Sequence, residues 1–130
     1  MRNTLPINSG EDVVRVRQEV RTLSVAAGFS LVDQTKFVTA ASELARNTLQ
    51  HGGGGRAHIE AFETGTQKGV RLVFEDEGPG ITDIERALQD GYTTGGGLGL
   101  GLSGARRLSN EFKIDSTPGK GTRVMIARWK

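Results

Sequence analysis

Apolar residues recur at spacings of three and four in two segments of the first half of the chain, which is the period of a helix with one buried face. The first segment follows Ser9, which begins an S-x-x-D capping pattern, and Gly28 is placed to end it. The capping pattern repeats at Ser30, and it predicts a second helix from about Val32 to His51. The predicted buried positions are Val13, Val16, Val20, Leu23 and Ala27 in the first helix and Phe37, Val38, Ala41, Leu44, Ala45 and Thr48 in the second.

Alternation of apolar and polar residues replaces the helical period after a run of four glycines. Residues 57–61 and 70–74 alternate on either side of the string TGTQKG, which predicts a β-hairpin. Residues 111–117 and 122–129 predict a second hairpin that closes the chain. Near the N-terminus the segment RNTLPI predicts a short strand, and its Pro6 suits the edge of a sheet.

Two further helices complete the predicted order of elements. A short helix is expected at 83–89, and a third main helix from about Leu98 to Asn110 follows a glycine-rich loop at 91–97. We therefore expect an α/β (α+β) two-layer sandwich, in which a mixed, mostly antiparallel sheet is covered on one face by three helices. We expect residues 1–130 to form a single domain.

One stretch in the predicted third helix, Gly99 to Gly104, fits the pattern G-x-G-x-x-G. The dinucleotide-binding fingerprint with this spacing follows a strand directly and opens a parallel βαβ unit. Here the stretch follows a short helix and a loop, and the residues after it form a hairpin, so we interpret the match as accidental. A Walker A loop is excluded because no Gly-Lys-Ser/Thr occurs, and the HRD and DFG segments of protein kinases are absent as well.

Composition narrows the possible chemistry. The chain has no cysteine, which excludes disulfides, thiolate catalysis and cysteine-zinc sites. It has only two histidines, so we do not expect a histidine metal cluster. The net charge is +2 with both signs interspersed, so the sequence gives no indication of nucleic-acid binding. Apolar stretches are too short to span a membrane and no signal segment is recognised, so we expect a cytoplasmic protein without a membrane partner.

Two polar residues of the predicted second helix are placed for chemistry. Glu43 and Asn47 are four residues apart and therefore share one face of the helix, near its buried side. A carboxylate and an amide at such positions are costly unless they have partners or a function. A solvated helix face is the alternative interpretation.

An acidic residue also ends the apolar strand at 70–74. Asp76 is followed by Gly78 and Gly80, and a carboxylate beside a bare backbone suits the recognition of a flat ring that carries an exocyclic amine. A tight turn around Pro79 is the alternative.

Two glycine-rich segments follow this acid along the chain. The run from Gly95 to Gly101 leads into a predicted helix start, whose free N–H groups bind phosphate well. The string GKGT, which ends at Thr122, forms the turn of the last hairpin. Taken alone it predicts only a turn.

Together, the strings ELARNTL, RLVFEDEGPGI, DGYTTGGGLGLGLSGARRL and STPGKGTRV resemble the nucleotide-binding boxes of the GHKL (Bergerat-fold) ATPases and kinases. The resemblance covers nearly the whole chain and is closest to the RsbT-type switch serine/threonine kinases of bacterial stressosomes. It implies binding of ATP and Mg²⁺ and the transfer of phosphate to a serine or threonine of a protein.

The resemblance also implies a role for individual residues. Glu43 matches the catalytic general base and Asn47 the magnesium ligand, whereas Asp76 matches the acid that reads adenine. The remaining positions that match nucleotide-binding residues are Gly78, Gly80, Gly95, Gly97, Leu98, Gly99, Leu100, Gly101 and Thr122.

The partners implied by the resemblance are STAS-domain scaffold or antagonist proteins as substrates, and a downstream phosphatase or other output enzyme that the released kinase activates. An anti-sigma factor that sequesters a sigma subunit is the main alternative, because such proteins share the nucleotide boxes. A histidine-kinase catalytic domain and an ATPase that drives dimer clamping are less well matched, since neither a phosphoacceptor helix nor a transducer domain is recognised.

Overall fold

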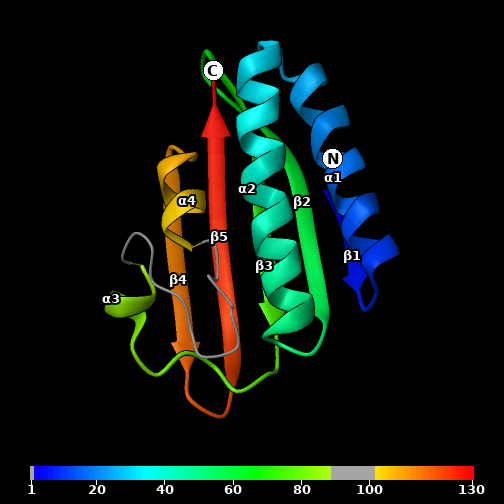
Figure 1. Ribbon diagram of the computed structural model, residues 1–130. Coiled ribbons are helices and arrows are strands. Elements are labelled where there is room, and N and C mark those ends of the chain that lie inside the picture. The colour runs from blue at the N-terminus through cyan, green and yellow to red at the C-terminus, as the bar shows by residue number, and fades with distance from the viewer. Residues whose placement is uncertain (1, 89–101) are drawn as a thin grey trace.

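A five-stranded sheet with helices packed on one face forms the protein (Figure 1), in a computed structural model that describes residues 2–88 and 102–130. The strand order is β1-β2-β3-β5-β4, and every pairing among the described residues is antiparallel. The predicted two-layer architecture is therefore confirmed. The strands are β1 (Arg2–Ile7), β2 (Gly55–Thr64), β3 (Gln67–Asp76), β4 (Glu111–Thr117) and β5 (Gly121–Trp129), and the helices are α1 (Gly10–Ala26), α2 (Leu31–Gln50), α3 (Ile84–Ala87) and α4 (Leu102–Arg107).

The two long helices begin where their capping residues predict. Ser9 accepts a hydrogen bond from the Asp12 amide at the start of α1, and Ser30 accepts one from the Asp33 amide at the start of α2. Helices α1, α2 and α4 cover the same face of the sheet (Figure 1). The core between the layers includes Val16, Val20, Phe37, Leu44, Ile59, Leu72, Phe74 and Ile126, which are all at most 2% exposed.

Two predicted boundaries are wrong. The first hairpin has only a two-residue loop, Gly65–Thr66, where a six-residue string was expected, because the strands pair up to Thr64 and Gln67. The third main helix ends at Arg107 and not at Asn110, because the Asn110 amide donates to the Ala127 carbonyl of β5. None of the described helices is long and apolar enough to cross a membrane.

One end of the sheet collects the segments that carry the predicted site. Helix α2 and strands β3 and β4 all end there, and β5 begins there, at the lower end in Figure 1. The loops that follow α2 and β3 and the turn between β4 and β5 therefore lie at this end. The antiparallel register pairs Asp76 at the end of β3 with Thr122 at the start of β5, which lies 46 positions later in the sequence.

Near the C-terminal end of α4, Arg128 of β5 connects the segment after α4 with the first turn of α2. Its guanidinium donates to the Leu108 carbonyl at 2.6 Å and to the Asp33 carboxylate at 2.8 Å. Arg128→Met should lower the free energy of unfolding by about 1–3 kcal/mol, because both acceptors lose a charged donor. Arg17→Met, at an exposed position of α1, is the control for chemical denaturation. Equal stability of the two variants would contradict this role for Arg128.

Candidate functional site

Helix α2 presents Glu43 and Asn47 one turn apart, as predicted. The Glu43 side chain is 41% exposed and lies 3.5 Å from the Arg46 guanidinium, which is one turn of the same helix away. Asn47 is only 7% exposed. Among the described residues, its Oδ1 atom is the one buried side-chain nitrogen or oxygen atom without a hydrogen-bond partner. A buried amide oxygen without a partner costs free energy, so this atom does not add to the stability of the fold.

The end of α2 is in direct contact with the end of β3. The amides of His51 and Gly52 both donate to the Asn47 carbonyl, which closes the helix. A Cβ atom on Gly52 would lie 2.4 Å from Cγ of Asp76, so only glycine allows the carboxylate to occupy this place. Asn47 therefore lies about one helical turn before Gly52, the residue that packs against Asp76.

The loop after β3 is fixed by its own glycines. The Gly78 amide donates to Oδ1 of Asp76 at 2.9 Å, and a Cβ atom on Gly78 would lie 2.7 Å from the Gly52 backbone. Gly80 has φ +75°, and a Cβ atom there would lie 2.4 Å from the Thr117 carbonyl. The predicted glycines thus allow two backbone segments to approach one another and the Asp76 carboxylate.

Three polar residues form a row across the ends of the strands. Asp76 of β3 is the register partner of Thr122 of β5, which is in turn the partner of Ser116 of β4. Thr122 is 6% exposed, and its hydroxyl lies 2.8 Å from that of Ser116. This row lies on the face that the helices cover, because Asp76 also packs against Gly52.

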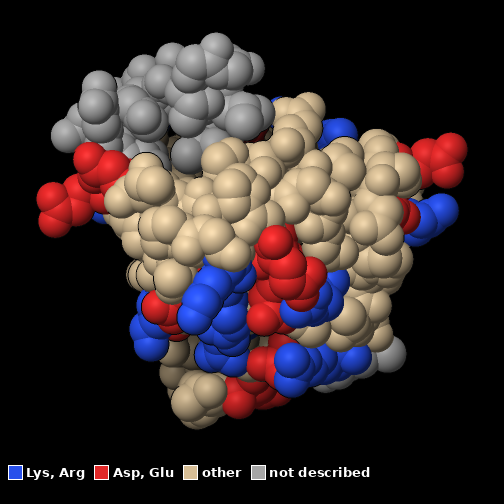
Figure 2. Space-filling model, turned by 90° about the horizontal axis from the view of Figure 1, so that it is seen from below, with Lys and Arg blue, Asp and Glu red and all other residues tan. Residues whose placement is uncertain are grey.

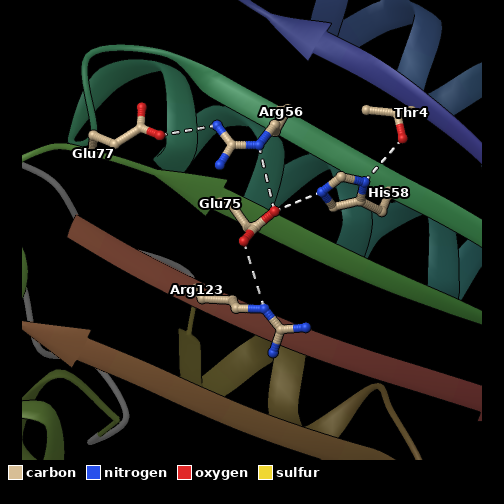
Figure 3. Close-up of polar contacts among 6 residues, drawn as sticks. All are labelled: Thr4, Arg56, His58, Glu75, Glu77 and Arg123. Carbon is tan, nitrogen blue, oxygen red and sulfur yellow. Dashed lines mark hydrogen bonds and ion pairs between the residues drawn. The ribbon is translucent and has the colours of Figure 1, made fainter.

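The opposite face of the same strands carries charges. Glu75 accepts from His58 and lies 3.4 Å from Arg56 and 3.6 Å from Arg123 (Figure 3). Figure 2, which views the molecule from this end, shows basic and acidic side chains interspersed in a band. Burial alone would raise the pKa of Glu75, but the hydrogen bond from His58 and the two guanidinium charges outweigh it and hold this pKa below its usual value.

A cavity of about 300 Å³ opens at this end of the sheet. Asp76, Ser116 and Thr122 line it together with charged residues of the uncovered face, whereas Asn47 and Glu43 are not among the described residues that line it. The cavity therefore lies at the strand ends and not at the face of α2 that carries Glu43 and Asn47.

The structure brings together several of the predicted site residues. Glu43 and Asn47 share a face of α2, and Asp76, with Thr122, lies beside the end of that helix. Two further residues of this site were not predicted: Gly52, which lies in the run of four glycines after α2, and Ser116, which has no motif of its own. The predicted positions Gly95, Gly97, Leu98, Gly99, Leu100 and Gly101 lie outside the described residues.

Comparisons with known proteins agree with this geometry. Residues 32–130 match the family model described as histidine kinase-, DNA gyrase B-, and HSP90-like ATPase. The chain is 43% identical over 118 residues to the serine/threonine-protein kinase RsbT of Bacillus subtilis. The matched region covers 91% of this chain and 89% of that protein. It is also 36% identical over 97 residues to an anti-sigma F factor of Thermoanaerobacter sp., in a match that covers 70% of this chain and 66% of that protein.

A solved structure supports the fold alone. The RsbU and RsbW domains of Rv1364c from Mycobacterium tuberculosis superpose with a TM-score of 0.66 at 21% sequence identity. The match covers 100% of this chain and 32% of that one.

The charge network around Glu75 predicts a pH-dependent stability. Because the pKa of Glu75 is lowered by folding, its carboxylate stabilises the protein at neutral pH, and this contribution is lost as the pH falls through the folded-state pKa. Glu75→Gln should therefore be less stable than the wild type at pH 7, and the difference should shrink toward acid pH. Glu63→Gln, at an exposed position of β2 outside this network, is the control in denaturation measured over pH. A difference that does not vary with pH would refute this contribution.

Proposed function

The chain belongs to the family of histidine kinase-, DNA gyrase B- and HSP90-like ATPases, and from this premise we propose that it is an ATP- and Mg²⁺-dependent serine/threonine protein kinase. Residues 1–130 form one nucleotide-binding kinase domain in this proposal. The identity of 43% to RsbT supports the kinase activity, since that relative is a serine/threonine-protein kinase.

The observation that carries the proposal is the buried, unpartnered Oδ1 atom of Asn47, one turn before the contact between Gly52 and Asp76. Mg²⁺ prefers oxygen ligands and usually keeps several waters and phosphate oxygens, so one protein oxygen is enough to hold it with a nucleotide. Among the described residues no group of three or more acidic, histidine or cysteine side chains is arranged to hold a metal. Asn47 fits the ion on chemical grounds, and the bound ion would neutralise charge on the transferred phosphate.

Asp76 and the glycines beside it are proposed to bind the adenine ring. One carboxylate oxygen is engaged by the Gly78 amide, which leaves the other to accept a hydrogen bond from the exocyclic amine. Thr122 is the cross-strand neighbour of this carboxylate and supplies a second hydrogen-bonding group. The glycines outside the described residues, Gly95, Gly97, Gly99 and Gly101, with Leu98 and Leu100, remain our proposed phosphate-facing segment.

Glu43 is proposed to act on the substrate hydroxyl. It lies on the same helix face as Asn47 but is far more exposed, so a protein substrate can reach its carboxylate. The hydroxyl oxygen of the substrate attacks the γ-phosphorus, the bond from that phosphorus to the bridging oxygen breaks, and ADP leaves. Glu43 orients the hydroxyl and accepts its proton.

The partners in this proposal are STAS-domain proteins of a stressosome or an anti-sigma antagonist as substrates, and a phosphatase or other output enzyme that the released kinase activates. They rest on the relationship to RsbT, and cytoplasmic location is proposed on the same basis. An anti-sigma factor is the second candidate, favoured by the 36% identity to an anti-sigma F factor. Phosphorylation of a STAS protein without binding to a sigma subunit would separate the two.

Glu43→Ala should bind ATP as tightly as the wild type but transfer phosphate at least about 100-fold more slowly, because the side chain contacts the nucleophile and not the nucleotide. Radiolabelled γ-phosphate transfer to STAS proteins and a separate ATP titration measure the two effects. Glu63→Ala, at an exposed position of β2, is the control. Equal transfer rates in Glu43→Ala and the wild type would remove the proposed role.

Asp76→Asn should weaken ATP binding by about ten- to 100-fold, because the amine of adenine loses a charged acceptor. The preference for ATP over GTP should fall at the same time. Calorimetric titration with both nucleotides measures this, and Glu63→Gln, at an exposed position of β2 outside the cavity, is the control. An unchanged ATP-to-GTP ratio would show that Asp76 does not read the base.

A further inference from the structure

A single peptide group in the loop after β3 is held at both of its polar atoms. The carbonyl of Gly80 accepts a hydrogen bond from Nε2 of His51 at 3.2 Å. The amide of Ile81, which belongs to the same peptide group, donates to Oγ of Ser116 at 2.8 Å. The two side chains come from the end of α2 and from β4, and they are 65 positions apart in the sequence.

We propose that His51 and Ser116 are positioning residues for the nucleobase pocket, which hold the Gly80–Ile81 peptide group in the orientation that ATP binding requires. This inference rests on the proposed function, because the loop they hold follows directly from Asp76. Neither side chain is assigned a contact with ATP.

The proton positions of this arrangement follow from its acceptors. A carbonyl oxygen can only accept, so Nε2 of His51 carries a hydrogen. The Ile81 amide can only donate, so the Ser116 oxygen accepts from it and keeps its own hydrogen for Thr122 or for the Gly121 carbonyl, at 2.8 and 3.2 Å. Ser116 therefore connects the held peptide group to the hydroxyl of Thr122.

The peptide group needs to be held because of its position in the chain. Gly80 has φ +75° and no side chain, so its own conformational preferences do not fix the peptide group that follows. The two residues that share this peptide group, Gly80 and Ile81, are both buried, so the loss of a partner at either polar atom is costly. The Gly119 amide also donates to the Pro79 carbonyl at 2.7 Å, but this hydrogen bond fixes the preceding peptide group and not the one between Gly80 and Ile81.

A held loop raises affinity for ATP by reducing the disorder that binding must remove. His51 and Ser116 should therefore affect ATP binding and leave the rate of phosphate transfer at saturating ATP unchanged. A variant that only destabilises the fold would lower the thermal stability, but it would not raise KM for ATP while leaving kcat unchanged.

The test compares two pairs of variants in ATP titration and steady-state kinetics. His51→Ala and Ser116→Ala should each raise Kd and KM for ATP by about three- to tenfold, with kcat unchanged. His51→Gln and Ser116→Thr, which keep a donor and a hydroxyl, should restore at least half of the lost binding free energy. The controls are His58→Ala, on the uncovered face, and Ser109→Ala, whose hydroxyl donates to Ala105.

Hydrogen exchange at the Ile81 amide tests the same inference without any nucleotide. This amide should exchange faster in Ser116→Ala and in His51→Ala than in the wild type, and the two controls should leave it unchanged. Because both residues hold one peptide group, the double variant should lose less ATP affinity than the product of the two single losses.

The outcomes separate this inference from the proposed function. If Asp76→Asn weakens ATP binding while His51→Ala and Ser116→Ala do not, the positioning role is wrong and the nucleotide site stands. If the Ile81 amide responds as expected but Asp76→Asn leaves ATP binding unchanged, the peptide group is held as described, but the proposed adenine site at Asp76 fails, together with the role of this loop in ATP binding.

Discussion

The carboxylate of Asp76 occupies the space that any side chain at position 52 would need. A Cβ atom on Gly52 would lie 2.4 Å from Cγ of Asp76, so this one contact requires glycine and fixes the end of α2 against the end of β3. The rest of the site depends on it, because Asn47 is one turn before Gly52 and Thr122 is the strand partner of Asp76. The metal-binding and base-binding parts of the proposed site are therefore positioned by a single packing constraint.

The same region contains a buried polar atom that lowers the stability of the fold. The Oδ1 atom of Asn47 is buried without a partner, whereas the polar atoms around it are hydrogen-bonded, including the Thr48 hydroxyl, which donates to the Leu44 carbonyl. A buried amide without a partner costs about 1–3 kcal/mol, which a leucine at this place would avoid. This cost is expected at a functional site, where an interaction with a ligand replaces one within the protein. On the other face of the sheet, Glu75 has a full set of partners and serves stability alone in this account.

Local patterns were sufficient to predict the elements and much of the proposed site. Helical spacing located Glu43 and Asn47 on one face of α2, and the end of an apolar strand located Asp76. The helix end at Arg107 and the roles of Gly52 and Ser116 were not predictable in this way, since each depends on a contact with a distant segment. Ser116 acquires its role from the register of β4 with β5, and from an amide that lies 35 positions earlier in the chain. His51 lies four residues after Asn47, but its partner, the carbonyl of Gly80, lies in a loop that no local period describes.

The central claim is that the unpartnered oxygen of Asn47 holds the magnesium ion that accompanies ATP. The most direct measurement is calorimetric titration of ATP, with and without Mg²⁺, into the wild type and Asn47→Leu. We expect Mg²⁺ to strengthen ATP binding to the wild type and to have little effect on ATP binding to Asn47→Leu. Without nucleotide, the variant should be at least as stable as the wild type. If Mg²⁺ strengthened ATP binding equally in both proteins, Asn47 would not hold the magnesium ion.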